Sequence, residues 1–134
     1  MSARIIVHSL EHALAALEAA EQRKVPVTLM SAPGAGGYAG PRWFLAVIAE
    51  AARAYPGASC DAVVDCAGEA GTVLAALRAG AKRVRFAGSD EARQKLAAVA
   101  AALGGEIEGD AEAAALDLLG ERDPLAAAGV YLGR

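Results

Sequence analysis

The stretch VPVTLMSAPGAGGYAGPRWFLAVI, residues 25–48, decides the fold. It opens on a short apolar run, residues 25–30, which is partly β-branched, as is typical of a strand buried on both faces of a parallel sheet. A glycine-rich loop follows over residues 31–40. Pro41 then begins a second apolar run, and proline is favoured in the first turn of a helix because the N–H it lacks would have no partner there. The stretch therefore predicts a strand, a loop and a helix in succession.

The rest of the chain continues this alternation. Ser9 and Ser89 each precede a helical pattern, and a serine oxygen at that position accepts a hydrogen bond from a first-turn amide. Further strands are predicted at residues 4–8, 61–66, 82–86 and 106–108, and helices at residues 10–24, 41–55, 68–79, 90–103 and 110–119, with a last helical segment from residue 123. The pattern indicates one α/β domain with a four- to five-stranded, mainly parallel sheet built from βα units. We assign residues 1–120 to this domain and residues 121–134 to a C-terminal helical tail.

Composition narrows the classes of partner. The net charge of −3 leaves no basic patch, which argues against nucleic acid and against an anionic membrane surface. Charged residues interrupt each apolar run before it reaches the ~20 residues that a membrane helix needs. Cys60 and Cys66 are spaced C-x5-C with no histidine pair nearby, and no secretory leader is evident, so we expect reduced thiols, no metal site and a cytoplasmic location. The apolar fraction of 55% favours contact between copies, and we expect a homodimer.

The glycine-rich loop is the strongest candidate for a ligand site. Ligands of parallel α/β proteins bind at the carboxyl ends of the strands, where this loop begins. Glycine lets an anion approach the backbone closely, and the free amides at a helix start point toward it. We therefore expect the amides between Pro33 and Trp43 to hold a small anionic ligand, a phosphorylated or carboxylated metabolite. The predicted ligand-binding residues are Ser31, Gly34, Gly36, Gly37, Tyr38 and Gly40.

Two other strand ends carry residues that suit proton transfer. Asp65 ends the apolar run of the third strand, where a base or an acceptor for a ribose hydroxyl is often placed. A structural ion pair with Arg85 is the alternative, because both side chains share a face if their strands are neighbours. His8 has a near-neutral reference pKa and follows the first strand, and a purely structural hydrogen bond is its alternative role. No nucleophile elbow or P-loop motif is present, so the reaction and the cofactor stay open.

Two resemblances to known families follow from these residues. Gly34, Gly36 and Ala39 spell G-x-G-x-x-A, which resembles the dinucleotide fingerprint of Rossmann-like domains and implies a nucleotide or dinucleotide ligand. The βα units over residues 4–105 also resemble half of a phosphate-binding (βα)8 barrel, which implies strands in sequential order. In such barrels the phosphate loop often follows later strands, whereas these glycines follow the second strand. Three functions remain: an anionic-metabolite binder, a homo-oligomeric assembly module and a nucleotide-binding domain.

Overall fold

The computed structural model describes residues 2–109 and 114–133. The chain divides into two compact units whose segments alternate along the sequence. The first consists of Met1–Met30, Ala46–Asp61 and Ala113–Arg134, and the second of Ser31–Leu45 and Ala62–Glu112. In the described residues no helix combines the length and the apolar character needed to cross a membrane.

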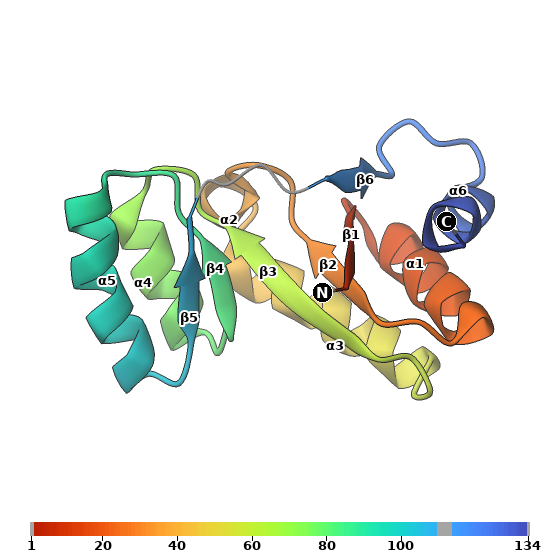
Figure 1. Cartoon of the computed structure of the whole chain (residues 1–134), viewed down its shortest axis with the longest axis horizontal. Helices are drawn as coiled ribbons and strands as arrows, with labels where there is room; N and C mark the ends of the chain where they lie inside the picture. The colour runs from red at the N-terminus through yellow and green to blue at the C-terminus, as the bar shows by residue number, and fades with distance from the viewer. Residues whose placement is uncertain (1, 110–113, 134) are drawn as a thin grey trace. The chain divides into compact units, whose positions relative to one another are not determined.

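The first unit is built on a central strand with a neighbour on each side. Strand β1 (Ala3–Ile6) pairs in parallel with β2 (Val27–Met30) and with β6 (Ala115–Asp117). Helix α1 (Leu10–Arg23) packs against α6 (Pro124–Leu132), and Figure 1 shows the two side by side. The Ser9 side chain caps α1 by accepting from the amide of His12 at 3.2 Å, as predicted. The core contains fully buried aliphatic side chains from both layers: Ile5, Leu17, Leu29 and Leu118.

The second unit has its strands in chain order. Strand β3 (Cys60–Asp65), most of which lies in this unit, pairs in parallel with β4 (Arg83–Arg85), and β4 pairs in parallel with β5 (Glu106–Glu108). Helices α4 (Ala70–Arg78) and α5 (Asp90–Ala102) contact each other and the strands β4 and β5 respectively (Figure 1). A one-turn helix, α2 (Ala35–Tyr38), contacts α4, and α3 (Pro41–Ala54) begins in this unit.

The parallel α/β architecture is confirmed, and the strand neighbours favour one of the two predicted orders. In Rossmann and flavodoxin sheets the first strand lies beside the fourth or the third. Here β1 has β2 and β6 as its neighbours, and β4 lies between β3 and β5. The pairs β1–β2, β3–β4 and β4–β5 agree with the sequential order expected for half of a (βα)8 barrel, whereas the pairing of β6 with β1 departs from it.

The described residues form six strands rather than four or five, because the predicted helix at residues 110–119 is wrong over its second half. Residues 115–117 form β6, in register with β1 through the pairs Arg4↔Ala115 and Ile6↔Asp117. Leu118 continues the pairing by donating from its amide to the Ile6 carbonyl at 3.1 Å, and its side chain is fully buried. Pairing to the edge of β1 thus outweighs the helix propensity of an alanine-rich segment. Residues 110–113 of that prediction lie outside the described residues.

Candidate functional site

The loops after β2 and β3 are joined through Asp65. Its carboxylate atom Oδ1 accepts hydrogen bonds from the amide of Gly34 at 3.0 Å and from the amide of Ala67 at 2.9 Å. Its own amide donates to Oγ of Ser31 at 2.8 Å, while the Ser31 amide donates to the Val63 carbonyl at 3.2 Å. Ser31 and Asp65 are both buried, at 2% and 8% exposure. The structure therefore brings together three predicted site residues, Ser31, Gly34 and Asp65.

The glycine loop does not form the continuous open cradle of amides that the sequence predicts. The loop closes instead into the single turn of α2, and four of its amides donate within the protein: Gly34 to Asp65 Oδ1, Ala35 to the Ala32 carbonyl, Gly37 to the Gly34 carbonyl and Ala39 to the Ala35 carbonyl, all at 2.9–3.0 Å. An anion cannot use these four donors unless the turn opens. The anion site stays a prediction, and Gly40 with the first turn of α3 is the region where an anion would need none of these four donors.

The four loop glycines have different structural roles. Gly34 and Gly40 adopt positive φ, at 74° and 88°, a region that strongly favours glycine. Gly36 has no room for a side chain, because a Cβ atom would lie 2.9 Å from the Asp65 carbonyl oxygen. Gly37 has room, since its nearest neighbour would be Thr72 Oγ1 at 3.6 Å. The side chain of Tyr38 lies outside what the structure describes.

The two carboxylate oxygens of Asp65 differ in their hydrogen bonding. In the described part of the chain, Oδ2 has no hydrogen-bond partner. Every buried side-chain nitrogen or oxygen there has one, so Oδ2 must be reached by solvent. The strand register places Asp65 opposite Arg85, as predicted from their parity. Burial, reinforced by the negative charge of Asp65, raises the pKa of the adjacent Cys66 thiol to about 12, which rules out a thiolate nucleophile there at neutral pH.

His8 lies in the first unit, in a separate cluster with Asp117 and His12. Its Nε2 atom lies 2.7 Å from Oδ1 of Asp117, the last residue of β6, which also accepts from the Leu119 amide at 2.9 Å. The His8 amide donates to Nδ1 of His12 at 3.1 Å, and the two rings meet edge to face with centroids 5.8 Å apart. Burial, and then the neighbouring His8, lower the pKa of His12.

The sequence pattern does not single out Asp117, because residues 110–119 are predicted to form a helix. The alternation of apolar and polar residues at positions 116–118 was the available signal for a strand, which would have put this carboxylate at a strand end.

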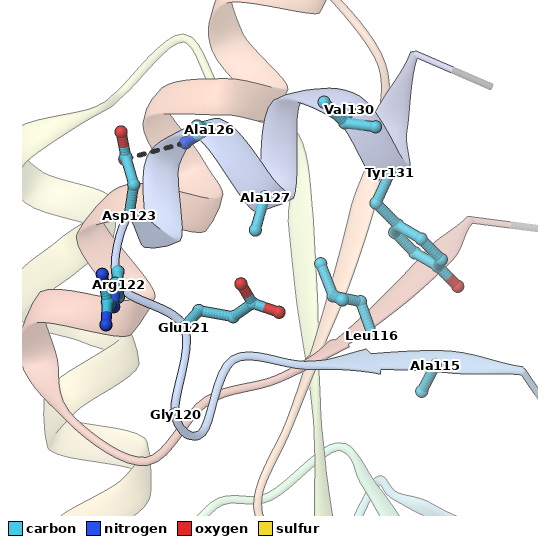
Figure 2. Close-up of a pocket in the computed structure, with 10 residues that line it drawn as sticks. All are labelled: Ala115, Leu116, Gly120, Glu121, Arg122, Asp123, Ala126, Ala127, Val130 and Tyr131. Carbon is cyan, nitrogen blue, oxygen red and sulfur yellow. Dashed lines mark hydrogen bonds between the residues drawn. The ribbon is translucent and has the colours of Figure 1, made fainter.

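A shallow cavity of about 750 Å³ opens between β6 and α6 in the first unit. Figure 2 shows the carboxylate of Glu121 directed into the space between Leu116 and Ala127. The wall is completed by the ring of Tyr131 and the side chain of Val130, which is 60% exposed. None of the predicted site residues lines this cavity.

Comparisons with known proteins identify a fold but no family. No protein-family model matches the chain, and no curated protein matches it. Among solved structures the chain is similar to the crystal structure of a Coccidioides immitis protein described as a "putative fructose-1,6-biphosphate aldolase", with a TM-score of 0.68 and 25% identity. The match covers 81% of this chain and 40% of that protein, so this chain spans less than half of its structural neighbour. The likeness supports a parallel fold built from βα units.

Proposed function

We propose that this chain binds a phosphorylated or carboxylated metabolite that also carries hydroxyl groups, in the second unit, where Asp65 meets the glycine-rich loop. The observation that carries this proposal is the state of the Asp65 carboxylate. One oxygen is fixed by the Gly34 and Ala67 amides, and the other has no partner in the described residues. An ionised carboxylate only accepts hydrogen bonds, so the group it recognises must donate one, as a hydroxyl does.

The anionic group of the ligand binds away from Asp65, because two negative charges repel each other. The first turn of α3 offers suitable donors. Gly40, at positive φ, has open space around it, and it is followed by Pro41 and by the exposed cation Arg42. Helix amides at that position point outward and favour an anion, and Arg42 adds a full positive charge. The neighbour's description names a sugar bisphosphate, which supports a sugar phosphate as the ligand class.

Isothermal titration calorimetry with three probes tests this proposal. Fructose 1,6-bisphosphate should bind more tightly than inorganic phosphate, and fructose should bind weakest, because only the first probe supplies both kinds of group. Dissociation constants up to about 1 mM, which corresponds to roughly −4 kcal/mol, would support it. Absence of heat with both phosphorylated probes at millimolar concentration would refute the proposal.

Charge-matched variants then locate the site. Arg42→Gln should weaken the binding of the sugar bisphosphate by roughly tenfold, or about 1.4 kcal/mol. Arg53→Gln is the control, because it removes the same charge from the last turn of the same helix. Asp65→Asn should reduce the difference in affinity between the sugar bisphosphate and inorganic phosphate, since the side-chain amide oxygen is a weaker acceptor than a carboxylate. Equal effects of the two arginine variants would exclude the first turn of α3 as the anion site.

A second candidate function is the homo-oligomeric assembly module. It is favoured by Val130, a large apolar side chain in the wall of the cavity between β6 and α6 that is 60% exposed (Figure 2). Leu119, which directly precedes the cavity residue Gly120 in the chain, is 67% exposed. Sedimentation velocity should then show a dimer that Val130→Glu converts to monomer. A wild-type chain that stays monomeric at high concentration would contradict this function.

A further inference from the structure

The cluster at the ends of β1 and β6 has a chemistry that the proposed function does not use. We propose that His8 and Asp117 form a proton-transfer site, with Nδ1 of His8 as the working atom, for a small molecule that carries an alcohol hydroxyl. This inference is independent of the metabolite proposal, because it rests on residues of the first unit alone.

The tautomer of His8 follows from its partner. The ionised Asp117 carboxylate can only accept a hydrogen bond, so the proton must be on Nε2 at the 2.7 Å contact. Neutral His8 therefore carries its lone pair on Nδ1. The carboxylate is itself held in place by the Leu119 amide at 2.9 Å, which keeps the acceptor oriented toward the ring.

The working nitrogen is accessible. The His8 side chain is 22% exposed, and among the residues that the structure describes no hydrogen-bond partner reaches Nδ1. Since no buried polar side-chain atom there lacks a partner, Nδ1 faces solvent. It also lies just beyond the carboxyl end of β1, on the edge of a parallel sheet where ligands bind.

His12 packs against the His8 ring and does not compete with it for the Asp117 carboxylate. His12 uses its Nδ1 to accept from the His8 amide, and its ring packs edge-on against His8. The step on the ligand is a simple proton transfer. The O–H bond of the ligand breaks, an N–H bond forms at Nδ1, and the electron pair remains on the ligand oxygen. The Asp117 carboxylate balances the charge of the imidazolium, and the proton returns in the reverse step.

Nitrogen-15 NMR of the full chain tests the tautomer directly, because the sequence contains only two histidines. The His8 signals, identified by their loss in His8→Gln, should show a protonated Nε2 and a bare Nδ1 in the neutral ring. Asp117→Asn should shift them toward a mixture of the two tautomers. Asp123→Asn is the matched control, because it makes the same change in a residue that instead caps α6.

Carbethoxylation with diethyl pyrocarbonate tests access without an identified ligand. His8 of the folded protein should be modified at Nδ1, and His8→Gln should lose that equivalent of modification. The proposal would be overturned if the neutral His8 ring carried its proton on Nδ1 instead of Nε2, or if His8 did not react until the protein unfolds. Either result would leave His8 with a structural hydrogen bond only. If Asp117→Asn does not fold, the wild-type tautomer and the His8→Gln comparison still decide the outcome.

Discussion

Replacing Gly36 by alanine tests the structural account of the glycine loop most sharply. An added Cβ would lie 2.9 Å from the Asp65 carbonyl oxygen, 2.9 Å from Val64 Cγ1 and 3.2 Å from Thr72 Cγ2. The first of these atoms belongs to the backbone of β3 and cannot rotate away. Overpacking of this kind costs about 1–3 kcal/mol. We therefore expect Gly36→Ala to lower the free energy of unfolding by that amount.

The matched control is Gly37→Ala, one residue further along the same turn. Its Cβ would meet only Thr72 Oγ1 at 3.6 Å, an ordinary contact, so the change in stability should stay within about 0.5 kcal/mol. Urea denaturation followed by circular dichroism measures both. With a slope of about 2 kcal/mol/M, the Gly36→Ala midpoint should fall by roughly 0.5–1.5 M. Equal midpoints for the two variants would show that the loop does not approach β3 as closely as described.

Three further predictions concern titration, thiol reactivity and helix capping. The pKa of His12 is lowered below 6.5 in the folded chain, so on acidification the unfolded chain takes up a proton at a higher pH than the folded chain. The free energy of unfolding should therefore fall as the pH drops from about 7.5 to about 5.5. The variant His12→Asn should flatten this dependence in urea titrations. Burial raises the pKa of both thiols, so Cys60 and Cys66 should react slowly with a disulfide reagent at about pH 8. Cys66 should react only as fast as the protein opens. Rapid labelling of the Cys66→Ala variant would show that the Cys60 thiol is exposed and would contradict this prediction. Asp123→Ala should cost about 1 kcal/mol in thermal or urea unfolding, because its side chain caps α6 by accepting from Ala126 at 3.0 Å, whereas Asp123→Asn should be nearly neutral.

The sequence predicts elements well where one local signal dominates. Serine caps, Pro41 and the apolar runs place α1, α3, α5 and the first five strands within about two residues. The pattern fails at β6, because three residues become a strand only when β1 offers them an edge, and that pairing spans about 110 residues of chain. Partners that distant cannot be read from local propensity.

The candidate site shows the same limit. Ser31, Gly34 and Asp65 are correctly grouped from the rule that strand ends converge. The sequence does not reveal that the Gly34 amide is taken by a carboxylate 31 residues later, because that contact depends on the exact height of the two loops above the sheet. The availability of a backbone donor is a tertiary property, whereas the presence of glycine is a local one.

The contact between α1 and α6 affects how this chain folds during synthesis. The two helices are about 100 residues apart, and translation at roughly 5–20 residues per second leaves a gap of about 5–20 seconds between them. Throughout that interval the alanine-rich face of α1 has no α6 to cover it. A nascent chain stalled before residue 124 should therefore expose the apolar face of α1 to chaperones. The first unit should complete its folding only after the second.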